Sequence, residues 1–328
     1  MGACYSKGQA MMRLTCPAFM ALALASASAL AAAATAAPVD KTKEPSAEEV
    51  AKMAAAAPAQ ARAKPEKPRR LLVFSAVPTG YWHDSIPYGK KAVEALAKKT
   101  GAFEAVVSDD LSNFEPANLA KFDAVVLNNA NNELFLPPNH EKLSGTEKDA
   151  ADRRDAALKK SFTEWLAGGK GLAILHVGVG AFRNWPEFGE IGGARFDGHP
   201  LGKRLATMKV DDPAHPLAAA FKTPTFLVMD EIYQVSDPYS RQKLRVLVSI
   251  DTAKTDTKVK GINRKDGDFG LVWVKSYGQG RVFYSAFGHV HDLFWNPMIL
   301  AHWLDGIQFA LGDLKADTTP SAKAAAKK

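Results

Sequence analysis

His176 follows an apolar run in the stretch GGKGLAILHVGVGAF, residues 168–182, and stands directly before a bend of small residues. Glycines at such a bend let other groups come close to the backbone. Catalytic folds that use a strand-to-helix bend usually place a Cys or Ser nucleophile there. Histidine instead transfers protons near neutral pH or ligates a metal, so this position predicts acid–base or metal-assisted chemistry.

Other polar residues follow further apolar runs and are candidates for the same site. In an open α/β sheet, ligands bind beyond the carboxyl ends of the parallel strands, where residues just after each strand converge. Asp230 and Glu231 form the carboxylate pair best suited to proton transfer or metal ligation. The candidate catalytic residues are His176, His83, Asp230 and Glu231, and the candidate substrate-binding residues are Asp84, Asn128, Asn129, His199, Trp185 and His289.

Each candidate also has a structural interpretation. Asp84 or Ser85 could cap the following helix, because a side-chain oxygen at an N-cap accepts hydrogen bonds from free backbone amides. A lone histidine is often a core residue, and Trp185 could pack in the core or against a sugar ring. The candidate ligands of a divalent metal such as zinc are His83, His176 and Glu231, although no HExxH or other tight spacing identifies a metal site.

An alternation of apolar strands and amphipathic helices must position these residues. Strands are expected at 71–77, 103–108, 123–129 and 172–176, with helices at about 87–99 and 149–167. This order predicts a mainly parallel sheet with helices on both faces. Short strands at 207–210 and 245–250 and a hairpin turning at 277–280 predict an antiparallel extension, and a helix over 297–311 closes the domain.

The two ends of the chain differ in composition from its body. Arg13, the apolar stretch 18–34 and small residues at 34–36 predict a signal peptide over 1–36, removed on export to the periplasm or the cell exterior. Residues 37–69 and 313–328 are rich in Ala, Pro and Lys, which predicts a disordered linker and a disordered tail. No other apolar run approaches the ~18 residues of a membrane span.

Charge and cysteine content exclude several functions. The net charge of +7 resides in the two ends, because the acidic and basic side chains of residues 71–312 balance. That balance provides no excess of basic residues to bind nucleic acid, and it favours a small neutral or weakly charged ligand. Both cysteines, Cys4 and Cys16, lie in the predicted signal peptide, so the exported chain has no disulfide and no thiol nucleophile.

Several motifs in combination resemble the ThuA-like (trehalose utilisation) family of the class I glutamine amidotransferase-like superfamily. The matching segments are WHDSIPYG (82–89), DAVVLNN (123–129), GGKGLAILHVG (168–178), WPEFGEIGGARFDGHP (185–200), DDPAHPL (211–217), DEIY (230–233) and YGQGRVFYSAFGHVHD (277–292). The resemblance implies one flavodoxin-like, three-layer α/β sandwich over residues 70–312. It also associates the chain with disaccharide or keto-sugar metabolism, and hence with a small carbohydrate as its ligand.

The resemblance also suggests site residues. It carries the family's motif histidines onto His83, His176, His199 and His289, and its acidic pair onto Asp230 and Glu231. Amidotransferase relatives have a cysteine at the elbow, whereas this chain has His176 and no cysteine after the signal peptide, which excludes glutamine amidotransfer. Many relatives have Ala-Ala after the elbow histidine, where this chain has Val177 and Gly178.

The leading hypothesis is an exported carbohydrate-active enzyme. It would act on a glycoside or a keto-sugar by hydrolysis, elimination or isomerisation, with histidines and carboxylates as acid–base groups or metal ligands. The alternative is a non-catalytic sugar-binding module on the same fold. The sequence leaves the substrate, the metal and the oligomeric state open.

Overall fold

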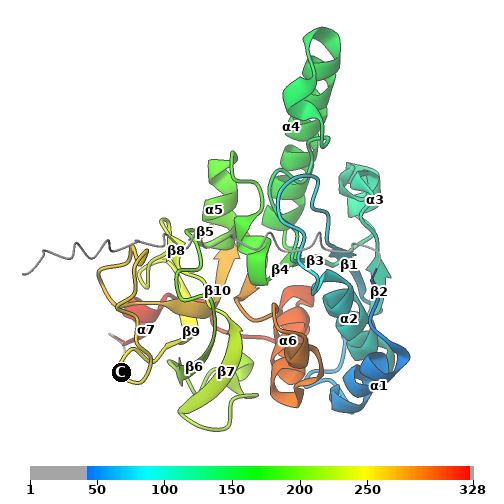
Figure 1. Cartoon of the computed structure of the whole chain (residues 1–328). Helices are drawn as coiled ribbons and strands as arrows, with labels where there is room; N and C mark the ends of the chain where they lie inside the picture. Colours follow the sequence, from blue (N-terminus) through cyan, green and yellow to red (C-terminus); the bar gives the residue numbers. More distant parts are fainter. Residues whose placement is uncertain (1–42, 326–328) are drawn as a thin grey trace, which may run out of the picture. The chain divides into compact units, whose positions relative to one another are not determined.

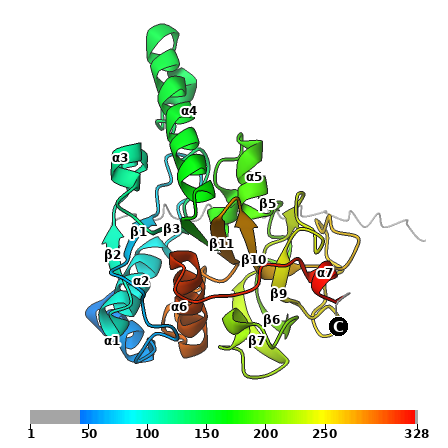
Figure 2. The same ribbon diagram turned by 180° about the vertical axis from the view of Figure 1, so that it is seen from behind.

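A nine-stranded sheet lies at the centre of the computed structural model, which describes residues 43–325 (Figures 1 and 2). Its strand order is β2-β1-β3-β4-β11-β10-β9-β6-β7. These strands are β1 (Arg70–Phe74), β2 (Glu104–Val107), β3 (Ala124–Asn128), β4 (Gly171–Leu175), β6 (Lys203–Val210), β7 (Thr225–Glu231), β9 (Arg245–Ile250), β10 (Gly270–Tyr277) and β11 (Gly280–Ser285). A small second sheet pairs β5 (Arg195–Phe196) with β8 (Val235–Ser236).

The strands from β2 to β11 in this order run parallel, and the strands from β10 to β7 join them in antiparallel pairs. Both β3 and β4 are buried along their whole length, as expected where helices cover both faces of a parallel sheet. The predicted α/β class is therefore confirmed. The second strand of the predicted hairpin, β11, pairs in parallel with β4, so it belongs to the parallel part of the sheet.

Helices cover both faces of the sheet (Figures 1 and 2). On one side lie α1 (Ala47–Ala56), α2 (Ile86–Thr100) and α6 (Pro297–Leu311), and on the other lie α3 (Pro116–Leu119), α4 (Gly145–Ala167) and α5 (Pro186–Gly192). Asn296 caps the start of α6, because its side chain accepts hydrogen bonds from the Met298 and Ile299 amides, and Gly312 ends the helix in the left-handed conformation. Its buried Trp303 and Ile307 tie it to the core of the domain.

Residues 43–69 fold onto the domain, which corrects the predicted disordered linker for this part of the chain. Helix α1 begins with a capping box between Ser46 and Glu49, and its Met53 is fully buried. Composition misled here because the few apolar side chains that the segment buries, such as Met53 and Ala57, are supplemented by ion pairs to residues distant in sequence. Arg62 binds Asp305, which lies 243 residues further on, and Arg69 binds Asp313.

The residues after α6 also pack on the domain, and they correct the predicted disordered tail as far as residue 325. Asp313 is buried, and the Asp317 carbonyl lies 2.9 Å from Nε2 of His215. The Ser321 amide, at the start of α7 (Ser321–Ala325), donates to the Leu244 carbonyl. The predicted signal peptide, 1–36, lies outside the described residues. Among residues 43–325, no helix has the length and apolar character that crossing a membrane requires.

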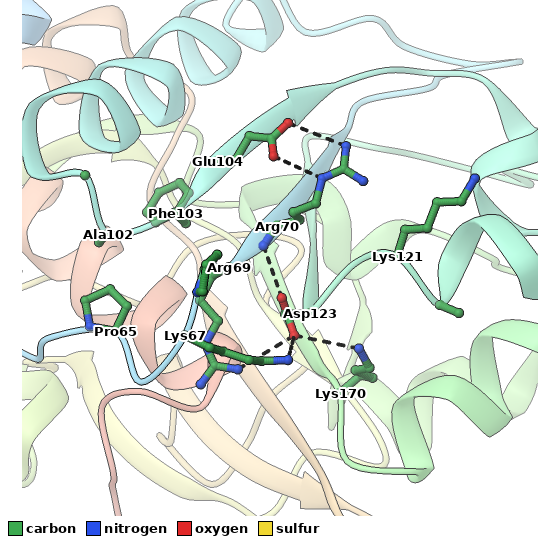
Figure 3. A pocket seen from close by; sticks show the side chains of 13 residues that line it. Pro65, Lys67, Arg69, Arg70, Ala102, Phe103, Glu104, Lys121, Asp123 and Lys170 are labelled. Carbon is green, nitrogen blue, oxygen red and sulfur yellow. Dashed lines mark hydrogen bonds and ion pairs between the residues drawn. The ribbon is translucent and has the colours of Figure 1, made fainter.

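Ion pairs line a pocket of about 800 Å³ at the end of the sheet where the parallel strands begin (Figure 3). The carboxylate of Asp123 lies 2.9 Å from Lys67 and 3.7 Å from both Arg69 and Lys170. The neighbouring Arg70 pairs with a glutamate of β2 at 3.0 Å. These contacts hold residues 67–70 against the ends of the strands. We therefore assign this pocket a structural role.

We expect Arg69→Ala to lower the free energy of unfolding by about 3 kcal/mol, because Asp313 would remain buried without its partner. Urea denaturation would measure the change. Lys160→Ala is the matched control, since Lys160 and Glu164 form an exposed pair and the expected change is below about 1 kcal/mol. Equal effects of the two substitutions would contradict the anchoring role of Arg69.

Candidate functional site

A cavity of about 420 Å³ lies beyond the carboxyl ends of the parallel strands. Loops that follow β1, β3, β4 and β11 contribute to it, as does the end of β7. This is the position at which open α/β sheets bind ligands. The lining residues are Tyr81, His83, Asn131, Val177, Arg183, Phe196, His199, Lys203, Glu231, Tyr233 and His289.

Three imidazoles and one carboxylate converge beside this cavity. His83, His176, His289 and Glu231 each offer one ligand atom, and these four atoms all lie within 4.8 Å of one another. The three imidazole rings stand nearly perpendicular to one another, with centroids 5.2 to 5.5 Å apart. Oε2 of Glu231 lies 3.6 Å from Nε2 of His176 and 3.7 Å from Nε2 of His289. Such a set can bind a divalent metal or transfer protons.

His176 is fully buried, and its ring has a fixed orientation. Nδ1 lies 2.7 Å from the carbonyl oxygen of Ala286. Because a carbonyl only accepts hydrogen bonds, Nδ1 carries a proton and Nε2 is free to accept, as it does from the Tyr233 hydroxyl at 2.7 Å. This arrangement, in which one ring nitrogen is held by the backbone and the other points into a site, is typical of metal-ligating histidine.

The backbone at His176 is in the left-handed region, with φ of +50°. This conformation is uncommon for a residue with a side chain and is often retained at functional sites. Gly288 allows the ring to fit, because a Cβ at Gly288 would lie 3.2 Å from Cβ of His176 and its own φ is +146°. The close approach of the two loops therefore requires a glycine at position 288.

Burial keeps two of the imidazoles uncharged. Burial, reinforced by the charges of the neighbouring histidines, lowers the pKa of His83 to about 2 and the pKa of His289 to about 4. Burial alone would raise the pKa of Glu231, but the close approach of His176, and the positive charge that His289 and His176 acquire when protonated, lower it to about 2. Neutral imidazoles and an ionised carboxylate are the states that metal binding requires. In addition, Nδ1 of His83 is buried without a hydrogen-bond partner among the described residues.

Asp230 lies next to Glu231 but does not face the cavity. Its fully buried carboxylate accepts hydrogen bonds from the backbone amides of Gly288, His289 and Val290, at 2.9 to 3.0 Å. Side chains alternate between the two faces of a strand, so β7 directs Asp230 inward and Glu231 toward the cavity. Asp230 therefore positions the loop that carries His289, and only Glu231 of the predicted pair joins the histidine cluster.

His199 reaches the cavity and lies on its exposed side. Its side chain is 53% exposed, and Nδ1 lies 3.6 Å from Oε1 of Glu231. The two oxygens of Glu231 thus face different partners, with Oε2 toward the buried histidines and Oε1 toward His199.

The other predicted binding residues lie outside the cavity lining. Asn128 and Asn129 are buried and brace loops, the first donating to Ser75 and the Ile86 carbonyl, the second lying 3.3 Å from the Gly288 carbonyl. Asp84 lies 3.5 Å from His291. Trp185 packs against Phe182 and Phe188. The capping interpretation does not hold for Ser85, which occupies the N-cap of α2 without a side-chain capping hydrogen bond.

The structure adds cavity residues that the sequence did not predict. Tyr233 is two positions after Glu231 in the DEIY segment, and this spacing could have placed it beside Glu231. Lys203 of β6 lies opposite Glu231 of β7 in the strand register, a position that no sequence pattern indicates. Tyr81 stands with its ring edge-on to His83, and Arg183 comes from the loop before α5.

Comparisons with known proteins agree on the fold. The family model described as "ThuA: Trehalose utilisation" matches residues 70–310. A thua-like protein from Bacteroides uniformis is 19% identical with a TM-score of 0.54, over 75% of this chain and 92% of that one. A thua-like protein from Parabacteroides merdae is 18% identical with a TM-score of 0.48, over 77% and 93% of the two chains. No curated protein matches.

A β-galactosidase from Bacillus circulans is also similar, at 10% identity and a TM-score of 0.41, over 76% of this chain and 31% of that one. Identities this low support a shared fold for the Bacteroides uniformis protein and indicate nothing about substrates.

We expect Asp230→Asn to lower the free energy of unfolding by about 2 kcal/mol, the loss typical of hydrogen bonds to a charged group. In Asp230→Asn, one carboxylate oxygen is replaced by an NH₂ group, which cannot accept a hydrogen bond from a backbone amide. Asp84→Asn, whose carboxylate is half exposed and contacts only His291 among the ion pairs, serves as the control and should change stability little. Urea denaturation of both variants tests the expectation, and similar stabilities would argue against the positioning role.

Proposed function

Because the chain belongs to the trehalose utilisation (ThuA) family, we propose that it is a metal-dependent enzyme acting on a carbohydrate, either a glycoside or a keto-sugar. One observation carries the proposal, namely the convergence of three histidines and Glu231 beside a cavity of about 420 Å³. A cavity of this size accommodates a small sugar. The family match supports the carbohydrate, and the cluster supports the chemistry.

The ligand set fits a zinc-like ion. Metal bonds of about 2.0 to 2.2 Å place tetrahedral ligand atoms roughly 3.3 to 3.6 Å apart. The separations in the cluster, all within 4.8 Å, would close to this value if the side chains moved by about 1 Å. Three imidazole nitrogens and one carboxylate oxygen are ligands that zinc accepts, and the buried His83 ring has one nitrogen, Nδ1, without a hydrogen-bond partner among the described residues.

When bound, a divalent ion would polarise a carbonyl or hydroxyl oxygen of the sugar. His199 is the group best placed to remove a proton, because it is exposed to the cavity and lies beside Oε1 of Glu231. With a metal on Nε2 of His176, the Tyr233 hydroxyl would lose the hydrogen bond that it donates there. The released hydroxyl could donate a proton to the sugar, since burial, and then the charge of Glu231, raise its pKa well above the usual value and keep it protonated. Elimination or isomerisation next to a ketone needs such a base and such an acid, together with stabilisation of the enolate.

The proposal includes a flavodoxin-like layout for the sheet and its helices. The parallel strands, the helices on both faces and the cavity beyond the carboxyl ends of the strands support this layout. The strands β10, β9, β6 and β7 form the antiparallel extension that contributes Lys203 and Glu231 to the cavity.

We expect the purified full chain to contain about one divalent ion per molecule and to convert at least one member of a panel of neutral and acidic disaccharides and their keto derivatives. His176→Ala and Glu231→Gln should lose most of the metal and the turnover, because each removes one ligand. Elemental analysis and product chromatography are the measurements, and chelation should abolish turnover of the unaltered chain.

His291→Ala is the matched control, since His291 lies two residues after His289 but is not part of the cluster. It should retain both metal and turnover. Full turnover by His176→Ala, or a chain that never takes up metal, would refute the proposal. Sugar binding without turnover by the metal-loaded chain would instead identify the alternative, a sugar-binding module.

We also propose that the chain is exported to the periplasm or the cell exterior. Arg13, the apolar stretch 18–34 and the small residues at 34–36 support this proposal. Mass spectrometry of the protein expressed with its N-terminus should show removal of residues 1–36. Replacement of Ala34 and Ala36 by bulky residues should block cleavage at this point, and a mature protein that keeps residues 1–36 would contradict the proposal.

A further inference from the structure

Two basic side chains line the candidate cavity without a carboxylate partner. Lys203 and Arg183 are both exposed at the cavity. No Asp or Glu among residues 43–325 lies within ion-pair distance of either one, whereas other basic residues of this part of the chain form such pairs. The only carboxylate in the cavity lining is Glu231, which faces three histidines instead.

The position of Lys203 makes the missing ion pair informative. Lys203 is the direct cross-strand neighbour of Glu231 in the β6–β7 register, where an ion pair would normally form. Its ammonium group nevertheless has no contact with that carboxylate within 4.0 Å, because the oxygens of Glu231 face His176, His199 and His289. The charge of Lys203 is therefore available to a ligand in the cavity.

Arg183 approaches the same cavity from another element. Its guanidinium group lies 5.7 Å from the centre of the Phe196 ring, which is itself part of the cavity lining. Stacking on an aromatic ring leaves the N–H groups of arginine free to bind an anionic oxygen. Tyr81 and Phe196 add apolar surfaces against which a sugar ring can pack.

The pocket at the opposite end of the parallel strands shows how this protein pairs basic side chains elsewhere (Figure 3). There, Lys67, Arg69 and Lys170 surround Asp123, so the protein itself neutralises much of the basic charge. In the candidate cavity, the one lining carboxylate, Glu231, faces histidines and forms no ion pair with Lys203 or Arg183. A metal ion on the histidine cluster would add further positive charge to this region.

We propose that the substrate is an anionic sugar, whose carboxylate or phosphate group binds Lys203 and Arg183 while its ring occupies the cavity. This inference rests on the proposed function for the sugar and revises the neutral ligand that the overall charge balance favoured. A net charge of zero over the body of the chain conceals a local excess of positive charge at the site. Charge-assisted hydrogen bonds from a lysine and an arginine are strong enough to select an anionic sugar over a neutral one.

The test compares three matched ligands on the metal-loaded full chain: D-glucose, D-glucuronate and D-glucose 6-phosphate. Kd values follow from the rise of Tm with ligand concentration. We expect at least one anionic sugar to bind about tenfold more tightly than glucose, the difference that one charge-assisted hydrogen bond provides. The anion that binds more tightly distinguishes a carboxylate from a phosphate.

The double variant Lys203→Gln, Arg183→Gln should abolish the preference, so that it binds that anionic sugar and glucose with equal affinity. Lys209→Gln, on the same strand but with its ammonium paired to Asp211 at 3.1 Å, is the control and should keep the preference. Equal binding of all three sugars, or a preference that survives in the double variant, would overturn the inference.

The metal content of the same samples separates this test from that of the proposed function. Loss of the anion preference with metal retained in the double variant supports the role of Lys203 and Arg183. A metal-loaded, active enzyme with no anion preference would overturn the anionic substrate and leave the proposed function standing.

Discussion

The buried carboxylate of Asp230 is the interaction on which the geometry of the site depends. It accepts hydrogen bonds from the backbone amides of Gly288, His289 and Val290. These bonds join the end of β7 to the loop after β11. That loop brings His289 to the cluster and places Gly288 against His176. Glu231 follows Asp230 on the same strand. Of these adjacent carboxylates, Asp230 positions the loop and Glu231 belongs to the histidine cluster.

In this site the His176 ring has a fixed orientation, and the other ionisable side chains each have a defined protonation state. The Ala286 carbonyl sets the proton on His176, and burial keeps His83 and His289 uncharged. Glu231 remains ionised and divides its two oxygens between the buried cluster and the exposed His199. Strained backbone at His176 is tolerated because the surrounding loops hold the residue from several sides. The arrangement is preorganised, as binding and catalysis both require.

Charge is distributed unevenly between the two ends of the parallel strands. At the end where the strands begin, basic residues are paired with Asp123, Asp313 and Glu104, and these contacts hold residues 67–70 in place. At the opposite end, Lys203 and Arg183 have no carboxylate partner among the described residues. The first group of charges stabilises the fold, and the second is available for a ligand.

The sequence by itself determined the α/β class, because the alternation of apolar strands and amphipathic helices is a local pattern. It also indicated His83, His176, His199, Glu231 and His289, because each follows a strand or lies in a recognisable motif. Only the tertiary structure decided that Asp230 points away from the cavity, that Lys203 lies opposite Glu231, and that residues 43–69 are folded. These features arise from strand register and from ion pairs between residues far apart in the chain, which no local pattern encodes.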